Sequence, residues 1–350
     1  MRHADIPDKE ELLSPAPLLE IADGFRVSRL LAVCIEMKLF TWLKDSQGVT
    51  TSDVSKRFGV SQYSADAILS ACASIGLLKK DASKYRNSEL AQKFLVEGQE
   101  FYFGDYIAYV DKGEYLNWVK LKMALYSRDP ARKNFTERGE LFSPENKLKV
   151  DYFWKAMHSL SVFTAAALSK SFDFSKYQSV LDLGGAPGSF SLALCKTFPQ
   201  LRATVFDLPF ACDITRNALN QQDTTGRISV RAGDFLSNSP LPSGFDSILL
   251  SNILHDWEDP TCIELLGRCY AALENKGCIV IAEAFIDDGR GGPQSAALMN
   301  LNMLIETYGR NRSVKEYASW LLDSGFTKIE HVKFSVKAAG ANGAIIGYKI

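Results

Sequence analysis

The stretch VLDLGGAPGSF, residues 180–190, decides the fold class of this 350-residue chain. An apolar run of strand type ends at Asp182 and Leu183, and a helical pattern follows the turn. Glycine lets a backbone turn sharply and approach a ligand closely. Pro187 suits the first position of the helix that we expect next. The stretch predicts a strand, a ligand-binding turn and a helix, and its three glycines are Gly184, Gly185 and Gly188.

Further apolar runs of strand type alternate with helical patterns after this turn. Such alternation predicts an α/β fold with a doubly wound, mostly parallel sheet, whose ligands bind at the carboxyl ends of the strands. Two final runs are separated only by a turn rich in Gly and Ala, which predicts an antiparallel hairpin. The runs are SVLDLG (179–184), RATVFDL (202–208), RISVRAG (227–233), FDSILLSN (245–252), GCIVIAEAF (277–285), FTKIEHVKFS (326–335) and GAIIGYKI (343–350).

Acidic residues stand at three successive strand ends. Asp207 closes the second strand, 23 residues after Gly184, where an acid accepts hydrogen bonds from ribose hydroxyls. Asp234 and Phe235 follow the third strand and supply an acceptor and a flat apolar face for adenine. With Asp182, these residues predict a cofactor that contains a nucleoside, although a glycine-rich turn alone also serves tight packing of a strand on a helix.

The glycine pattern narrows the choice of cofactor. A dinucleotide-binding turn has glycines at the positions that Ala186 and Ser189 occupy here, so NAD is disfavoured. S-adenosylmethionine carries no phosphate, and its sulfonium cation tolerates nearby carboxylates. It is the expected cofactor, and it is a methyl donor.

Composition excludes several other classes of protein. The chain is 46% hydrophobic and 23% charged, as in an ordinary globular protein, and its net charge of -1 offers no broad attraction for nucleic acid or an anionic membrane. The seven cysteines show no Cys-x-x-Cys and no His at zinc spacing, so we expect reduced, buried thiols and no metal site. Residues 1–17 lack the apolar core of a signal peptide, and no uninterrupted apolar run is long enough to span a membrane. A cytoplasmic location is expected.

The half of the chain before about residue 175 has helical periodicity. Residues 50–78 predict a helix, a turn at Gly59 and a second helix, and residues 79–88 follow like a wing. DNA binding is the obvious interpretation of a helix-turn-helix unit. The second helix, however, carries no Lys or Arg and contains Asp66. DNA-binding proteins need positively charged side chains to pair with the phosphates. The apolar surface of the second helix favours packing against a second copy of the chain.

The stretch SNILHDWEDP, residues 251–260, places His255 at the carboxyl end of a predicted strand. A single histidine beside an apolar run is more often a core or capping residue than a catalyst. A phenol loses its proton with a pKa of about 10 and an imidazole with a pKa of about 6.5, so a histidine can take the proton from a phenol as it is methylated. That role calls for a carboxylate on the other ring nitrogen, and Glu283, at the end of the next strand, is the candidate.

The chain resembles the S-adenosylmethionine-dependent O-methyltransferases of the acetylserotonin and plant caffeic-acid type. The resemblance runs from about Ala22 to the carboxyl terminus and rests on the segments DGFRVSRLLA, VFDLP, GDF, LHDW, LNML and SGF. It implies a winged-helix-like dimerisation domain over residues 1–100, a helical linker covering the active site over 101–170, and a catalytic domain over 171–350. It also implies a homodimer.

The resemblance further implies roles for individual residues, carried over by position. His255 would be the general base, with Glu283 and Asp256 completing the catalytic set. The acceptor substrate would be lined by Phe153, Met157, Asn302, Met303 and Glu306. The cofactor would be bound by Gly184, Gly185, Gly188, Asp207, Leu208, Asp234, Phe235, Ser251 and Trp257.

Two departures from the family pattern leave the activity open. Ala186 adds a methyl group to the glycine turn, and Asn311 stands where the methyltransferases carry a second glutamate beside the histidine. An amide cannot stabilise an imidazolium by charge. Methyl transfer to a hydroxyl of a small aromatic or polyketide-like metabolite is the favoured function. The alternatives are hydroxylation, decarboxylation or pericyclic chemistry on a similar metabolite, and a non-catalytic protein that binds S-adenosylmethionine.

Aromatic residues between positions 101 and 126 are candidates for the mouth of the site. Stripes of this kind are usually core, so no one of them is assigned to the substrate. A flat acceptor suits an apolar pocket of this composition. The candidates, which we expect on helices, are Tyr102, Tyr106, Tyr109, Trp118 and Met123.

Overall fold

The computed structural model describes residues 14–127, 147–222 and 226–350. The chain divides into two compact units between Gln99 and Glu100. Two segments discussed above lie outside the described residues. They are residues 1–13, which make up most of the segment that lacks the apolar core of a signal peptide, and residues 128–146 of the predicted linker. Within the described ranges, no helix is both long and apolar enough to cross a membrane.

The first unit consists of five helices and one hairpin in its described part. Thr50 and Asp53 form a capping box that starts the third helix, and Gly59 ends it in a left-handed conformation, with φ 67°. Ser61 caps the next helix through the backbone N–H of Ser64. The elements are α1 (Ala16–Glu36), α2 (Leu39–Trp42), α3 (Thr51–Phe58), α4 (Gln62–Ser74), the antiparallel strands β1 (Leu78–Asp81) and β2 (Lys84–Asn87), and α5 (Glu89–Phe94).

The second unit is built on a seven-stranded sheet with the order β5-β4-β3-β6-β7-β9-β8. The first five strands of the sheet in that order are parallel, and β9 pairs antiparallel with both β7 and β8. All seven predicted strands are present, and the final pair forms the predicted hairpin. The strands are β3 (Ser179–Leu183), β4 (Arg202–Asp207), β5 (Ile228–Ala232), β6 (Phe245–Ser251), β7 (Leu273–Glu283), β8 (Lys328–Lys333) and β9 (Gly343–Tyr348).

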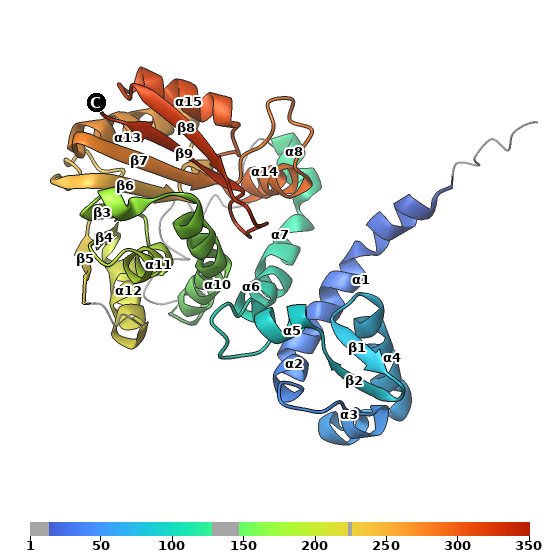
Figure 1. The fold of residues 1–350 in the computed structure, drawn as a ribbon. Helices are drawn as coiled ribbons and strands as arrows, with labels where there is room; N and C mark the ends of the chain where they lie inside the picture. The colour runs from blue at the N-terminus through green and yellow to red at the C-terminus, as the bar shows by residue number, and fades with distance from the viewer. Residues whose placement is uncertain (1–13, 128–146, 223–225) are drawn as a thin grey trace, which may run out of the picture. The chain divides into compact units, whose positions relative to one another are not determined.

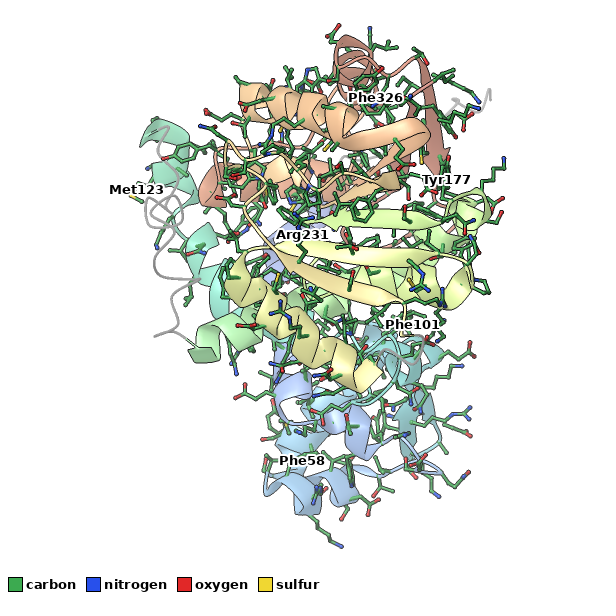
Figure 2. The ribbon with its side chains drawn as sticks, turned by 90° about the vertical axis from the view of Figure 1, so that its left-hand side faces the viewer. Phe58, Phe101, Met123, Tyr177, Arg231 and Phe326 are labelled. Atoms are coloured by element: carbon green, nitrogen blue, oxygen red, sulfur yellow. The ribbon has the colours of Figure 1, made fainter. Side chains whose placement is uncertain are left out.

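Helices cover both faces of this sheet, with α10, α11 and α12 on one face and α13 and α15 on the other (Figure 1). Successive residues of a strand point to opposite faces. Leu181 and Ile248 accordingly pack in the cluster on the α13 and α15 side, and Val180 and Leu249 pack in the cluster on the α10 and α11 side. Figure 2 labels one member of each cluster, Phe326 of the first and Tyr177 of the second.

The remaining helices of the second unit precede the sheet or connect its strands. The segment predicted as a linker, where it is described, belongs to the same compact unit as the sheet. The helices are α6 (Gly104–Tyr109), η1 (Val110–Glu114), α7 (Tyr115–Trp118), α8 (Leu121–Ser127), α10 (Lys147–Ser171), η3 (Phe174–Lys176), α11 (Ser189–Thr197), α12 (Pro209–Gln222), η4 (Leu254–Asp256), α13 (Asp259–Ala272), α14 (Gln294–Glu306) and α15 (Val314–Asp323).

Two local expectations are wrong. Pro187 does not occupy the first position of α11, because Gly188 takes a left-handed conformation, with φ 96°, and the helix begins only at Ser189. Tyr102 lies in an irregular segment before α6 rather than on a helix. All seven cysteines are buried and free, and Cys34 and Cys72 place their sulfur atoms 3.4 Å apart.

Candidate active site

The glycine turn and the histidine follow neighbouring strands in the middle of the sheet. Strands β3 and β6 pair with Leu183 opposite Leu250, so the turn after β3 and the 3₁₀ turn η4 after β6 lie at the same edge. The order of strands along the chain reverses at this pair, with β4 on one side and β7 on the other. A doubly wound sheet opens its ligand crevice at such a point.

The side chain of His255 is paired with a buried carboxylate. Its Nδ1 lies 2.6 Å from Oε2 of Glu283, which ends β7 and is only 1% exposed. The second oxygen of Glu283 accepts the backbone N–H groups of Ile253 and Leu254 at 3.1 and 3.0 Å. One carboxylate therefore orients both the imidazole and the backbone that carries it.

The charge state of His255 follows from this pairing. Burial lowers the pKa of the imidazole, but the charges of Glu283 and Asp256, and the hydrogen bond from Nδ1, outweigh it and raise the pKa to about 9. Because Nδ1 donates to a carboxylate, Nε2 is the ring atom left to exchange a proton with a substrate. Nε2 lies 3.7 Å from Oδ1 of Asp256, which is outside hydrogen-bond distance.

The carboxylate of Asp207 is buried against the glycine turn. Its Oδ2 accepts the backbone N–H of Ala186 at 3.2 Å, and its Oδ1 accepts that of Leu208 at 2.7 Å. Burial raises the pKa of Asp207 to about 6, against the effect of these two hydrogen bonds. The turn and the end of β4 are thus joined through one acid.

Two glycines of the turn leave no room for a side chain. A Cβ on Gly184, where φ is 67°, would lie 2.5 Å from Cδ1 of Ile253, and a Cβ on Gly185 would lie 2.3 Å from the carboxyl carbon of Asp182. The backbone of the turn therefore passes close to the end of its own strand, β3, and to Ile253, which follows β6. This close approach explains the glycines at these two positions.

The polar groups around the turn fit a nucleoside cofactor without phosphate. Residues 180–190 contain no Lys or Arg to pair with a phosphate. Ser251, at the end of β6, has a buried hydroxyl with no hydrogen-bond partner among the described residues, as expected of a group that a ligand completes. Phe235 and Trp257 lie edge to face, with ring centroids 6.3 Å apart, beside Asp234, whose Oδ1 accepts the N–H of Leu236. These residues would hold the adenosine of S-adenosylmethionine.

Polar side chains of α14 are held by α7. The indole N–H of Trp118 donates to Oδ1 of Asn302 at 2.9 Å, and Nδ2 of Asn117 donates to Oε1 of Glu306 at 3.2 Å. Asn302 and Glu306 are buried, as is Met303 between them. The amide of Asn302 therefore has its oxygen occupied, and its NH₂ group, which donates one hydrogen bond to Sδ of Met299 at 4.0 Å, has a second N–H to donate.

The other predicted substrate residues lie mostly on α10 and α6. Phe153 and Met157 are half-buried on α10, and the ring of Phe153 packs edge to face on that of Tyr109, with centroids 5.7 Å apart. Met123 on α8 is 55% exposed, and Figure 2 shows it at the outside of the molecule. The structure groups Phe153 with the aromatic residues of α6 and does not bring Met123 to them.

The amide NH₂ of Asn311 is bonded to α14, whereas its buried Oδ1 has no hydrogen-bond partner among the described residues. The side-chain NH₂ donates to the carbonyl of Ala296 at 2.9 Å, and the backbone N–H of Asn311 donates to Oδ1 of Asn300 at 2.9 Å. Both acceptors belong to α14. The donor of this amide therefore anchors the loop before α15 to α14.

Two contacts near the site have no counterpart in the sequence analysis. Nδ1 of His158 on α10 lies 2.9 Å from Oγ of Ser189, the first residue of α11, and burial lowers the pKa of this imidazole. Arg312 is wholly buried and donates to the carbonyls of Leu254 and Trp257. No local pattern marks either residue, because their partners are distant in the sequence. In the described parts of the chain, no group of three or more His, Cys, Asp or Glu side chains could hold a metal ion.

Comparison with known proteins assigns the chain to a family. A family model described as an O-methyltransferase domain matches residues 138–327, and a model of the O-methyltransferase dimerisation domain matches residues 19–97. The chain belongs to the O-methyltransferase family. The family expected from the sequence motifs is confirmed, as are the mostly parallel sheet with its antiparallel hairpin and the helical amino-terminal domain.

Relatives in this family methylate small aromatic compounds, by their names. A 3-hydroxy-5-methyl-1-naphthoate 3-O-methyltransferase of Streptomyces sahachiroi is 35% identical over 96% of this chain and 95% of its own length. Acetylserotonin O-methyltransferase of Bos taurus is 32% identical over 89% and 92% of the two chains. The crystal structure of human N-acetylserotonin methyltransferase in complex with SAM superposes with a TM-score of 0.84, at 26% identity, over 98% of this chain and 99% of that one.

Proposed function

We propose that this O-methyltransferase transfers a methyl group from S-adenosylmethionine to a hydroxyl of a small aromatic or polyketide-like metabolite, with His255 as the general base. Membership of the family and the names of its relatives support the reaction and the class of acceptor. The observation that carries the assignment of the base is the 2.6 Å pairing of His255 Nδ1 with Glu283, which leaves Nε2 to take the proton.

One group of residues in the site would bind the cofactor. When bound, S-adenosylmethionine supplies a methyl group on a positively charged sulfur. Asp207, Asp234 and Ser251 would hold its polar groups, and Phe235 and Trp257 its adenine. The glycine turn and Leu208 complete that part of the site.

The acceptor is positioned by the other part of the site. Asn302 offers a donor whose orientation Trp118 fixes, Glu306 offers a carboxylate, and Phe153, Met157 and Met303 offer apolar surface. Holding the hydroxyl oxygen in line with the methyl group supplies a large part of the rate. As the new bond forms, Nε2 of neutral His255 accepts the hydroxyl proton, and the carboxylates of Glu283 and Asp256 stabilise the resulting imidazolium.

His255→Gln tests the assignment of the base. The variant should bind S-adenosylmethionine with unchanged affinity and transfer its methyl group about a hundredfold more slowly or worse, because only proton removal is lost. Calorimetry measures the affinity, and methyl-labelled S-adenosylmethionine with a panel of hydroxynaphthoates and hydroxyindoles measures the transfer. Undiminished transfer in the variant would exclude His255 as the base. Product formed by the wild type without label would contradict methyl transfer itself.

We also propose that the protein assembles as a homodimer. The dimerisation domain supports a homodimer. The domain boundaries at residues 100 and 170, the winged character of the first domain, the cytoplasmic location and the absence of nucleic-acid binding stay predictions.

A further inference from the structure

A buried arginine holds the backbone of the turn that carries the histidine. Arg312 lies just before α15 and is 0% exposed. Its Nη1 donates to the carbonyl of Leu254 at 2.7 Å, and its Nη2 donates to the carbonyl of Trp257 at 2.6 Å. These two carbonyls flank His255 and Asp256 on either side. The planar fork of a guanidinium can reach both at once, whereas a lysine ammonium cannot span them in the same way.

The other bonds of Arg312 fix the fork in place. Its Nε and Nη2 donate to Oδ1 of Asp259 at 3.1 and 2.8 Å, and its Nη1 also donates to the carbonyl of Arg310 at 3.0 Å. The guanidinium lies 4.8 Å from the ring centroid of Trp320 on α15. A buried charge is tolerated only when its donors are satisfied, and here every nitrogen has an acceptor.

Glu283 binds the same turn through backbone N–H groups, whereas Arg312 binds it through backbone carbonyls. Its Oε1 accepts the N–H groups of Ile253 and Leu254, while Arg312 donates to the carbonyls that follow. The backbone around His255 is therefore bonded through its donors by a carboxylate and through its acceptors by a guanidinium. We propose that Arg312 is a positioning residue for methyl transfer, which acts by fixing where Nε2 of His255 meets the acceptor hydroxyl. This proposal rests on His255 being the general base.

Arg312 also has an electrostatic effect on the imidazole. Burial lowers the pKa of His255, the carboxylates of Glu283 and Asp256 raise it, and the positive charge of Arg312 lowers it. The ionisable groups that adjoin Arg312 and Glu283 from the surrounding elements are Cys262 of α13, Asp259 at the start of α13 and Tyr317 of α15. Removing the arginine charge should move the pKa of His255 upward, whereas removing the glutamate charge should move it downward.

The neighbouring Arg310 offers a matched control. It pairs with the same Asp259 at 2.7 Å and with Glu316 at 2.8 Å, but its side chain bonds neither Leu254 nor Trp257. Arg310→Met removes the same charge from the same carboxylate and leaves the turn of the histidine alone. Arg312→Met removes the charge and the hydrogen bonds to both carbonyls. Arg312→Lys keeps the charge but loses the planar guanidinium that reaches both carbonyls at once.

The experiment compares these variants in the full-length protein. Histidine labelled with ¹³C at Cε1 reports the pKa of His255 without turnover, with His255→Gln assigning the resonance. Calorimetry gives the affinity for S-adenosylmethionine, and the best hydroxylated aromatic acceptor found for the wild type gives kcat and KM. We expect Arg312→Lys to lower kcat about tenfold, and Arg312→Met about a hundredfold, because misplacement of a base by about 1 Å can cost a hundredfold in rate.

The expected pattern separates positioning from general stability. Arg312→Met should raise the pKa of His255, Arg312→Lys and Arg310→Met should leave it unchanged, and affinity for S-adenosylmethionine should stay near the wild-type value in all three. Equal losses of kcat in Arg310→Met and Arg312→Met would overturn the proposal. If Arg312→Met does not fold, Arg312→Lys decides, since a wild-type kcat there overturns it. A wild type that labels no acceptor would count against the proposed function instead, while the pKa measurements still test the effect of Arg312 on His255.

Discussion

The proton on His255 determines when the proposed base can act. A general base must be neutral before it takes a proton, yet the pKa of His255 is raised to about 9. At neutral pH most of the imidazole is therefore already protonated in the free protein. Activity should rise with pH until the imidazole has lost this proton.

Glu283→Gln tests this dependence. The wild-type kcat/KM should increase with pH up to about 9, and the variant should reach its plateau at lower pH because the charge that raises the histidine pKa is gone. Its plateau should also be lower, because a neutral amide no longer stabilises the imidazolium. The pH profile of kcat/KM is the measurement.

Asp256→Asn is the control for that profile, because Asp256 is the more exposed carboxylate and lies 3.7 Å from Nε2. The pH profile of Asp256→Asn should also shift to lower pH, but by less than that of Glu283→Gln. If Glu283→Gln has the same pH profile of kcat/KM as the wild type, the protonation of His255 does not govern the rate.

Asp207 is the second residue whose role a single substitution tests. Asp207→Ala should weaken the binding of S-adenosylmethionine by about 2 to 3 kcal/mol, since it removes a charge-assisted acceptor for ribose hydroxyls. Since the pKa of Asp207 is raised to about 6, wild-type affinity should also decline as the pH falls below that value. Calorimetry measures both effects. Asp213→Ala on α12, an exposed acid paired with Arg216, should change neither, and unchanged affinity in Asp207→Ala would place the ribose elsewhere.

At the scale of elements, α7 and α14 form the acceptor side together. Trp118→Phe keeps an aromatic ring but removes the indole N–H that occupies the oxygen of Asn302. The amide can then turn, and the KM of the acceptor should rise about two- to tenfold, as for the loss of one hydrogen bond. Steady-state kinetics measures the KM, and affinity for S-adenosylmethionine should not change.

Tyr115→Phe on the same helix is the matched control, because Tyr115 is 53% exposed. It should leave the KM of the acceptor unchanged. An acceptor KM that Trp118→Phe does not alter would show that Asn302 does not bind the acceptor.

Elements and strand ends were predictable from the sequence, whereas side-chain pairings across the fold were not. Buried parallel strands are short apolar runs, and their common direction places Asp207 and Glu283 at one edge. The start of α11 was missed because the left-handed Gly188, and not Pro187, sets it. The bond between Trp118 and Asn302 joins residues 184 positions apart, so no local periodicity records it. The contacts of Arg312 with η4 were missed for the same reason.

At the scale of the whole molecule, exposed apolar side chains on α1 indicate how copies associate. Ile21 and Phe25, within the dimerisation domain, are 77% and 55% exposed, and Leu18 just before it is 68% exposed. We expect a dimer at micromolar concentration. Changing both Ile21 and Phe25 to Asp should raise its dissociation constant about a hundredfold or more, because each large apolar side chain contributes about 1.5 to 3 kcal/mol when buried.

Analytical ultracentrifugation measures this assembly. Leu322→Asp is the control, since Leu322 on α15 is 54% exposed but lies in the other unit. It should leave the dimer intact. A wild type that sediments as a stable monomer would contradict the proposed homodimer.

The bonds from Glu283 and Arg312 to the turn of His255 end on backbone atoms. Because N–H and C=O groups are the same in every residue but proline, the identity of the side chains at 253 and 257 does not enter into holding the turn. Replacing the side chain of Ile253 therefore leaves both sets of bonds in place, whereas replacing Trp257 would also remove a ring that we propose holds the adenine. A library that randomises position 253, proline excepted, would vary the side chain that packs beside Gly184 while the bonds from Glu283 and Arg312 still hold the turn of the histidine.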